Sequence, residues 1–248
     1  MNSQAPLVSI IIPVFNGEDF VADVFRNVEQ QDYPSKEIIF VDDGSEDSSK
    51  EIIQQIDDVQ YVYQPNRGPA SARNTGFRKS RGKYIAFLDV DDLWTENQLA
   101  HQVNVLEENP QYDMVQGRIQ DLKRIGENKN AGIFEKTGSP YYSVNLGSAV
   151  FRRTVFETVG LFDENLHFNE DTDWFVRAWD KKIQKKKVEE VVLHYRKHAN
   201  NLTHHKNSRH SGMAWLLKKR LDLQRRENQS SENSVSSRWM SINEYIGW

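Results

Sequence analysis

Three aspartates that follow a short apolar segment could bind a divalent cation. Asp89, Asp91 and Asp92 come directly after residues 84–88, whose composition is typical of a buried β-strand. Carboxylates so close together repel one another, and Mg²⁺ or Mn²⁺ would relieve this, since both prefer one or two carboxylates completed by water and phosphate oxygens. The other interpretation is turn and helix-cap chemistry before a helix that begins at Thr95. The Asp-x-Asp pattern by itself leaves both open.

A second acidic pair follows another apolar segment. Asp42 and Asp43 come after residues 37–41 and begin an Asp-Gly-Ser sequence. One of these carboxylates could accept a hydrogen bond from the NH of a uracil-like base, with Arg73 and Asn74 completing a polar lining. Asp-Gly-Ser before a helix is equally common as a turn and N-cap, so this pair is also compatible with a structural role.

Strands and helices alternate around these acidic residues. Hydrophobic periodicity predicts strands at residues 7–14, 37–41, 59–63 and 84–88, and helices at residues 18–31, 45–56, 68–79 and 95–108. Such alternation favours an α/β fold with a mostly parallel central sheet and helices on both faces. Ligands bind such sheets beyond the carboxyl ends of the strands, where the aspartates fall. Neither G-x-G-x-x-G nor G-x-x-x-x-G-K-[ST] occurs, so a dinucleotide fingerprint and a P-loop are unsupported.

The pattern is less regular after Asn109. We predict a strand at residues 114–119, a mobile loop at 128–142, a helix at 171–179 and a late strand at 188–195. A basic amphipathic helix at 213–226, a polar linker and an aromatic tail are expected to form a helical C-terminal extension.

In order and spacing, these motifs resemble family 2 glycosyltransferases of the GT-A fold. The resemblance rests on VSIIIPVFN at 8–16, VDDGS at 41–45, NRG at 66–68, ARNTG at 72–76, FLDVDD at 87–92, GS at 147–148, FRR at 151–153, GLFDE at 160–164 and EDTD at 170–173. It covers residues 7–200. It implies a Rossmann-like sheet, a nucleotide-diphosphate sugar donor (most often a UDP-sugar), Mn²⁺ or Mg²⁺ as cofactor, and inverting transfer to a hydroxyl of a glycan or lipid-linked acceptor in cell-surface polysaccharide synthesis.

The resemblance also assigns roles to residues. Asp171 matches the catalytic base, which takes the proton of the acceptor hydroxyl. Asp91 and, with less support, His198 match positions near the metal. Nucleotide binding is implied for Pro13, Phe15, Asp42, Asp43, Arg73 and Asp89. A role at the diphosphate or the acceptor is implied for Arg196, Gly147, Ser148 and Glu170. For Asp171 and His198 a helix-terminal carboxylate and a surface histidine are the structural alternatives.

The same resemblance suggests how the chain is divided. Residues 1–205 are predicted to be the catalytic domain, with a nucleotide-sugar-binding half at 1–110 and an acceptor-binding half at 111–205. Residues 206–248 form the predicted extension. Processive synthases of this superfamily carry Gln-x-x-Arg-Trp, but Val235 stands where the Gln before Arg238-Trp239 should be, so transfer of a single sugar is favoured.

Composition and charge limit the alternatives. The 248 residues include no cysteine and no apolar run long enough to span a membrane, so we expect a cytoplasmic protein. The net charge is −4, but residues 181–226 carry +11 from 14 Lys and Arg and three acidic residues. This segment could contact an anionic membrane at its inner face or pack on the domain. A nucleic-acid-binding protein is a weaker alternative, because only Tyr195 and Trp215 are aromatic there, so no nucleic acid is expected. A nucleotide-sugar-binding module without turnover would lack Asp91 or Asp171, and both are present.

Overall fold

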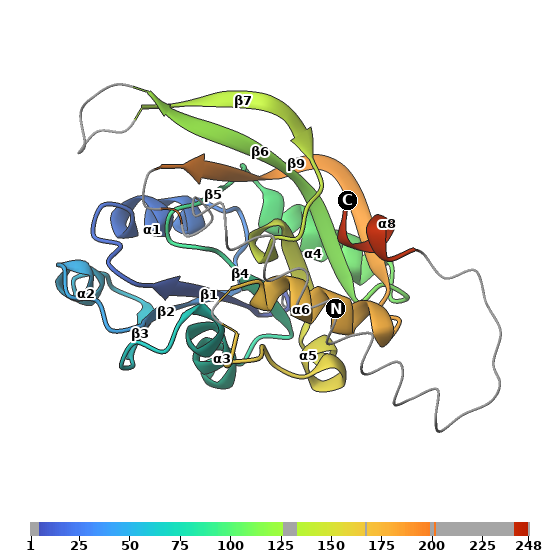
Figure 1. Cartoon of the computed structure of the whole chain (residues 1–248), viewed down its shortest axis with the longest axis horizontal. Coiled ribbons are helices and arrows are strands. Elements are labelled where there is room, and N and C mark those ends of the chain that lie inside the picture. Colours follow the sequence, from blue (N-terminus) through green and yellow to red (C-terminus); the bar gives the residue numbers. More distant parts are fainter. Residues whose placement is uncertain (1–4, 126–132, 167, 199–200, 202–240, 248) are drawn as a thin grey trace.

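The computed structural model describes residues 5–125, 133–166, 168–198, 201 and 241–247 (Figure 1). Its strands are β1 (Val8–Val14), β2 (Lys36–Asp42), β3 (Val59–Tyr63), β4 (Tyr84–Phe87), β5 (Leu93–Trp94), β6 (Met114–Ile125), β7 (Ile133–Tyr141), β8 (Ala149–Arg152) and β9 (Lys185–Lys197). Its helices are α1 (Val21–Glu29), α2 (Ser49–Gln54), α3 (Pro69–Lys79), α4 (Gln98–Glu108), α5 (Arg153–Val159), α6 (Glu170–Asp180) and α8 (Ile242–Ile246), with a short 3₁₀ helix, η1, at Leu146–Ser148.

The strands form one mixed sheet in the order β3-β2-β1-β4-β8-β6-β9-β5, and β7 pairs with β6. Strands β3, β2, β1 and β4 are parallel, whereas β8 joins β4 and β6 in antiparallel fashion. The long strands β6 and β9 are again parallel. The predicted α/β class is therefore confirmed, with the parallel order strongest in the first half.

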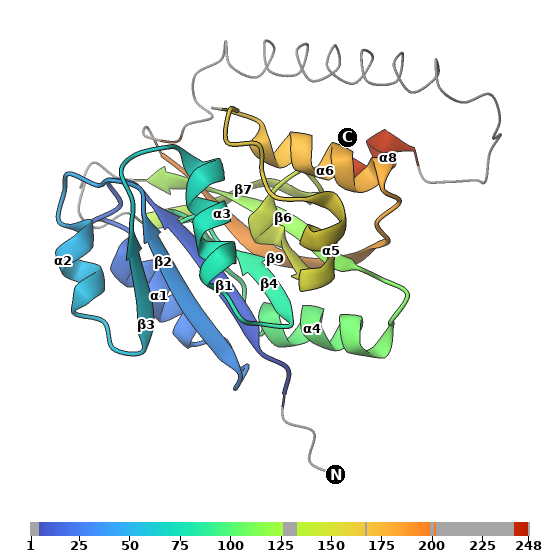
Figure 2. The ribbon, with the colours of Figure 1, turned by 90° about the horizontal axis from the view of Figure 1, so that it is seen from below.

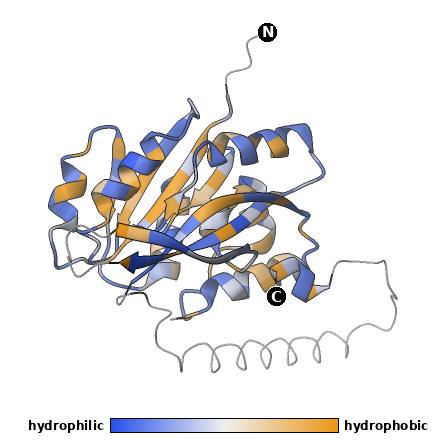
Figure 3. Ribbon diagram, turned by 90° about the horizontal axis from the view of Figure 1, so that it is seen from above, coloured by the Kyte–Doolittle hydropathy of each residue, from blue (hydrophilic) through white to orange (hydrophobic). Residues whose placement is uncertain are grey.

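Helices cover both faces of the sheet because the buried strands are apolar on both sides. In β1, Ile10 and Ile12 face α1 and α4, while Ile11 faces α3 on the opposite side. Figure 2 shows α3, α5 and α6 together on one face, and Figure 3 shows the hydrophobic central strands between the helices. The result is three layers, with the carboxyl ends of β1, β2 and β4 at a common edge.

Two local predictions were wrong. Thr95 does not cap α4: its hydroxyl donates to Val191 O (2.7 Å), and the N-cap is Asn97 in the left-handed conformation (φ 57°). Residues 133–141, expected as part of a mobile loop, form β7, which pairs antiparallel with an extended β6. The polar composition of β7 reflects its largely exposed position beside β6, where strand pairing rather than burial determines the conformation.

The chain's last described helix, α8, packs on α6, and its Tyr245 and Ile246 are buried in the same cluster as Trp174 and Phe175. The predicted basic helix at 213–226 and the polar linker lie outside the described residues. No helix in the described part of the chain is both long and apolar enough to cross a membrane.

Candidate active site

The site is built around a contact between the loop after β4 and the end of β9. The Nε2 atom of His198 lies 3.0 Å from Oδ2 of Asp91. This contact joins residues 107 positions apart, because the pairing of β5 with β9 brings the two segments together. The structure thus places together the two residues that sequence analysis assigned to a metal.

Asn201 completes this contact, although sequence analysis did not single it out. Its side-chain Nδ2 donates to Asp91 Oδ2 (3.1 Å) and to Arg196 O (3.1 Å), and its Oδ1 accepts from the backbone N–H of His198. Asn201 is buried. It therefore holds the Asp91 carboxylate and the backbone of His198 in place, and its position three residues after His198 was the only sequence signal for this role.

Phe20 supports the same site from the start of α1. Its ring stacks on that of His198, with centroids 4.9 Å apart. The Arg196 guanidinium also lies over the Phe20 ring, 4.9 Å from its centroid. Arg196 is buried, donates from Nε to Asp91 O and lies 3.4 Å from Asp23 Oδ2. Its Nη2 atom has no hydrogen-bond partner among the described residues, so one buried donor remains for a ligand.

The donor set fits a divalent cation held mainly by its ligand. Asp91 and His198 offer one carboxylate and one imidazole, a combination that accommodates Mn²⁺ or Mg²⁺ when phosphate oxygens and water complete the coordination. Within the described residues no group of three or more His, Cys, Asp or Glu side chains gathers as a metal site. The buried Arg196 donor beside this pair also suits a diphosphate.

Asp92 has a structural role behind this pair. Its Oδ1 accepts from the backbone N–H of Arg196 (3.0 Å), which ties the β4 loop to β9. Burial raises the pKa of Asp92 well above its ordinary value, and the nearby Asp91 and Asp89 carboxylates raise it further. A cation at this edge would offset that accumulation of acidic groups.

Arg73 lies between two carboxylates. Its Nη2 donates to Asp89 Oδ1 (2.7 Å) and its Nη1 to Glu170 Oε1 (2.6 Å). Arg73 and Glu170 are buried, and Asp89 is partly exposed. The guanidinium thus links the acidic loop after β4 to the start of α6.

Asp171, the predicted base, follows Glu170 in the first turn of α6. Its Oδ1 accepts from Thr172 N (2.6 Å) and the Thr172 hydroxyl (3.2 Å), whereas Oδ2 has no hydrogen-bond partner in the described part of the chain. Burial raises the pKa of Asp171 to about 7, with a further upward contribution from the Glu170 carboxylate and a downward one from Arg73. A carboxylate with one free oxygen and a pKa near neutrality is suited to general base catalysis.

Asp42 and Asp43 are buried and already accept several hydrogen bonds. Asp42 accepts from Ser45 N (2.8 Å) and the Tyr61 hydroxyl (2.7 Å). Asp43 accepts from Gln64 Nε2 (2.7 Å) and Arg67 N (2.9 Å) at Oδ1, and from Gly68 N (2.8 Å) at Oδ2. Each oxygen of a carboxylate can accept two such bonds, so Asp43 Oδ2 retains capacity for a ligand.

The remaining residues that sequence analysis assigned to the site differ in how exposed they are. Pro13 is in β1 and partly buried, and Phe15, just beyond that strand, is 51% exposed. Gly147 and Ser148 are buried in η1, where Gly147 O accepts from the Trp94 indole (2.7 Å) and the Ser148 hydroxyl donates to Asn145 O (2.8 Å). Phe15 is therefore free to contact a ligand, while Gly147 and Ser148 have structural partners.

The segment before α6 is held to α3 by side chains that sequence analysis did not assign to this task. Asn74 Nδ2 donates to Phe162 O (2.9 Å) and to Glu164 Oε1 (2.9 Å), and Asn74 Oδ1 accepts from Phe162 N (3.0 Å). Glu164 also accepts from Arg67 Nη2 (3.0 Å). These bonds cross between the two halves of the chain.

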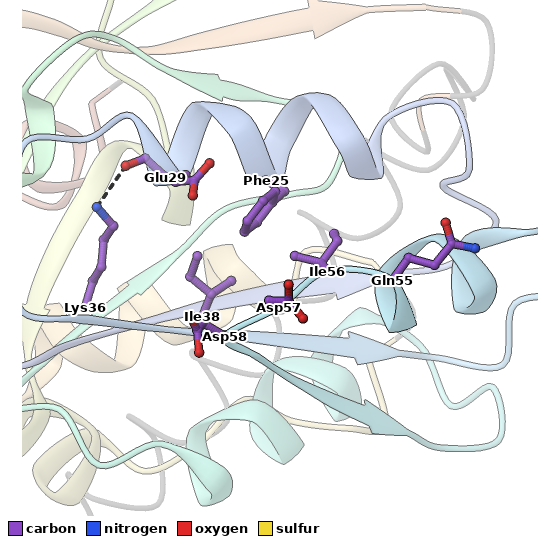
Figure 4. Close-up of a pocket in the computed structure, with 8 residues that line it drawn as sticks. All are labelled: Phe25, Glu29, Lys36, Ile38, Gln55, Ile56, Asp57 and Asp58. Atoms are coloured by element: carbon purple, nitrogen blue, oxygen red, sulfur yellow. Dashed lines mark hydrogen bonds between the residues drawn. The ribbon is translucent and has the colours of Figure 1, made fainter.

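A pocket between α1, α2 and β2 lies away from this site. Figure 4 shows it lined by Phe25, Glu29, Lys36, Ile38, Gln55, Ile56, Asp57 and Asp58. Lys36 and Ile38 are at the amino-terminal end of β2, whereas the candidate site lies beyond the carboxyl ends of the strands. This pocket is therefore not part of the acidic edge.

Solved structures with the same fold define the class to which this arrangement belongs. The chain superimposes on residues 1–349 of S. aureus TarS in complex with UDP with a TM-score of 0.62 at 18% identity, covering 77% of this chain and 60% of that TarS chain. It superimposes on the mannosyltransferase PcManGT of Pyrobaculum calidifontis, in complex with GDP-Man and Mn²⁺, with a TM-score of 0.69 at 18% identity, covering 98% and 68%. The fold is GT-A.

Sequence comparison then gives the family. The model of glycosyl transferase family 2 matches residues 9–177, and the chain belongs to this family. An uncharacterized glycosyltransferase of Rickettsia typhi is 33% identical over 190 residues, which is 70% of this chain and 59% of that protein. The putative teichuronic acid biosynthesis glycosyltransferase TuaG of Bacillus subtilis is 40% identical over 113 residues, covering 44% of this chain and 45% of TuaG. The chain thus spans about three fifths of the length of the Rickettsia relative.

Proposed function

We propose that the protein is a metal-dependent, inverting glycosyltransferase that moves one sugar from a nucleotide-diphosphate donor to a hydroxyl of a glycan or lipid-linked acceptor. The observation that carries this proposal is the position of Asp171. Its Oδ2, which has no hydrogen-bond partner among the described residues, belongs to a helix that Arg73 ties directly to the acidic loop after β4. A proton acceptor and a cation-binding edge are thereby held in one unit, as group transfer from a diphosphate requires.

In the proposed mechanism, Asp171 Oδ2 accepts the proton of the acceptor hydroxyl as the oxygen attacks the anomeric carbon. A single displacement of this kind inverts the configuration at that carbon. Arg196, whose Nη2 donor has no partner among the described residues, would bind the departing diphosphate. Asp91 and His198 would hold a Mn²⁺ or Mg²⁺ ion, which when bound stabilises the negative charge that develops on the leaving group.

The donor is proposed to be a UDP-sugar. Support comes from the neighbours with the same fold, since TarS structures contain UDP or UDP-GlcNAc, although PcManGT contains GDP-Man. Asp43 Oδ2 and the exposed Phe15 are the proposed contacts to the base and nucleoside, beside Pro13 and Asp42. We further propose that residues 1–110 bind the donor and residues 111–205 the acceptor. The putative role of TuaG in teichuronic acid biosynthesis supports an acceptor in cell-envelope polysaccharide synthesis. We also propose that the protein acts in the cytoplasm or at the inner face of the membrane.

Calorimetric titration tests the donor site. UDP should bind the wild-type protein more tightly with Mn²⁺ than without it, and Asp91→Ala should abolish the difference. The matched control is Asp47→Ala, which changes an aspartate in the loop after β2 that contacts neither Asp91 nor His198. If neither UDP, GDP nor dTDP binds in the presence of Mn²⁺ or Mg²⁺, the proposed function is wrong.

Turnover tests the base. Asp171→Asn should bind UDP as the wild type does but lose roughly 10²-fold to 10⁴-fold in transfer or donor hydrolysis, because the amide cannot accept the proton. Unchanged turnover in this variant would remove Asp171 from the mechanism.

A further inference from the structure

Arg73 and Glu170 form a buried ion pair directly beside the proposed base. The pair joins α3 to the first residue of α6 through a 2.6 Å contact, and the side chains are 7% and 10% exposed. The second arm of the guanidinium is held by Asp89 at 2.7 Å. Because a buried carboxylate without a cation is costly, Arg73 must accompany Glu170 in the folded protein.

Asp171 is the next residue, so its ionisation depends on both charges. Glu170, one residue before it, disfavours a second negative charge, and Arg73 favours it. The other charged pair near the start of α6, Asp173 with Arg177 (2.8 Å), is internal to that helix. Asp89 pairs with the second arm of the Arg73 guanidinium. The Thr172 hydroxyl contacts Oδ1 only, which leaves Oδ2 for the substrate.

We propose that Glu170 and Arg73 are positioning residues for Asp171: Arg73 anchors the start of α6 to the acidic loop, and the opposite charges of the two residues set the pH at which Asp171 can accept a proton. This role differs from nucleoside binding by Arg73 and from diphosphate or acceptor binding by Glu170, the roles that the family resemblance implies. It rests on the proposed function, in which Asp171 is the base.

The directions of the pKa contributions agree with this geometry. Burial and then Glu170 raise the pKa of Asp171, and Arg73 lowers it. Removing the charge of Glu170 should therefore lower the pH midpoint of Asp171, and removing the charge of Arg73 should raise it. A purely mechanical role for the ion pair would give no such opposite shifts.

The first test follows the titration of Asp171 directly and needs no substrate. Protein labelled with ¹³C at the aspartate carboxyl carbon is titrated by NMR, and the Asp171 signal is identified by its loss in Asp171→Asn. We expect the midpoint to fall by about 1 pH unit in Glu170→Gln and to rise by about the same amount in Arg73→Gln. Arg73→Lys, which keeps the charge, should stay closer to the wild type.

The matched control is Arg78→Gln. Arg78 is also on α3, is 56% exposed and pairs with Glu164 rather than Glu170, so its substitution should leave the Asp171 midpoint unchanged. If Arg73→Gln does not fold, Glu170→Gln and Arg73→Lys still decide the matter. A folded Glu170→Gln protein with an unmoved midpoint, or a shift of equal size in Arg78→Gln, would overturn the inference.

The second test uses the pH dependence of donor hydrolysis or transfer. The midpoint of the rate should move in the same direction as the NMR midpoint in each variant. If the NMR midpoints shift but the rates keep the wild-type pH dependence, Asp171 is coupled to the pair but is not the base, and the proposed role fails. Absence of turnover with every donor, together with the expected NMR shifts, would place the failure in the proposed function and not in the charge coupling.

Discussion

At the scale of residues, the two neighbouring carboxylates at the start of α6, Glu170 and Asp171, differ in their burial and hydrogen bonding. Glu170 is buried against Arg73, while among the described residues Asp171 shares hydrogen bonds only with Thr172, at Oδ1. The surroundings of each residue, rather than its type, therefore distinguish Glu170, which is held in an ion pair, from Asp171, which can accept a proton. The sequence Glu-Asp alone does not show which of the two residues has which role.

The raised pKa of Asp171 predicts the pH dependence of the wild-type enzyme. Asp171 must be deprotonated to act as base, and burial raises its pKa to about 7. The rate of transfer should therefore rise with pH through a midpoint near 7, instead of being level above pH 5 as for an ordinary aspartate. Measuring kcat between pH 5 and 8.5 at saturating donor and metal checks this, and a rate independent of pH throughout that range would contradict it.

Asn201→Ala should weaken Mn²⁺ binding by roughly 10-fold or more, because Asn201 orients both Asp91 and His198 and groups behind metal ligands typically contribute this much. Titration of Mn²⁺ by electron paramagnetic resonance, with UDP present, measures the dissociation constant without requiring turnover. Asn243→Ala, an exposed asparagine on α8, is the control. Equal affinities in wild type and Asn201→Ala would show that the hydrogen bonds are dispensable.

Sequence analysis named candidate residues at this edge but few of the side chains that hold them in place. The Asp-x-Asp was named from its spacing after an apolar segment, and the Glu-Asp pair and His198 from the family resemblance. The structure brings Asp91 to His198, and it links Asp89 to Glu170 through Arg73. Asn201 and Phe20 were missed because an amide and an aromatic ring acquire a role only through the neighbours that the fold supplies. Sequence periodicity placed Phe20 in the core stripe of a helix.

At the scale of elements, α3 can hold Arg73 in place because it packs very closely on the sheet. Gly76 faces β1, and a Cβ atom at this position would lie only 2.4 Å from Cγ2 of Ile11 and 3.2 Å from Cγ2 of Val41. The glycine in the ARNTG motif is thus explained by packing. Because α3 lies so close to the strands, the Arg73 guanidinium reaches both Asp89 and Glu170.

Gly76→Ala should lower the free energy of unfolding by about 1 to 3 kcal/mol, because Ile11 is buried, branched at Cβ and unable to move aside. This loss outweighs the gain of about 1 kcal/mol in helix propensity. Urea denaturation measures it, with Lys79→Ala at the exposed end of α3 as control. A more stable Gly76→Ala protein would mean that α3 can shift away from the sheet.

The elements of the first half were predicted well and those of the second half less so. Strands β1 to β4 are short apolar runs separated by turn sequences, which sequence periodicity detects directly. Strand β7 carries a mostly polar and exposed sequence, and its conformation depends on pairing with β6, a partner that local sequence does not reveal. The predicted loop was wrong for this reason.

At the scale of the whole molecule, α8 attaches a distant part of the chain to α6, the helix that carries the proposed base. Tyr245 is fully buried, its ring lies 4.5 Å from the Lys185 ammonium, and Lys187 Nζ donates to Glu244 O. Gly247 adopts φ 83°, and a Cβ there would lie 3.0 Å from the Tyr142 backbone, so the helix end is fitted closely to its neighbour.

Tyr245→Ala should therefore lower the free energy of unfolding by about 3 kcal/mol or more, as expected for loss of a fully buried aromatic side chain. Asn243→Ala on the exposed side of the same helix should change it little. Chemical denaturation followed by circular dichroism compares the two. Equal stability of both variants and the wild type would mean that α8 contributes nothing to the folded state.

The contacts at the candidate site can form only after β9 has paired with β6. The contacts of Asp91 with His198 and of Arg73 with Glu170 join positions 107 and 97 residues apart, so none of them can form until the second half of the chain has been synthesised. Contacts of such long sequence separation form slowly, after local elements. On the ribosome, residues 1–110 would emerge first, and Asp91 and Arg73 would lack the contacts with His198 and Glu170 until the later residues followed. The acidic edge is therefore completed only when β9 takes its place beside β6 and α6 docks on α3.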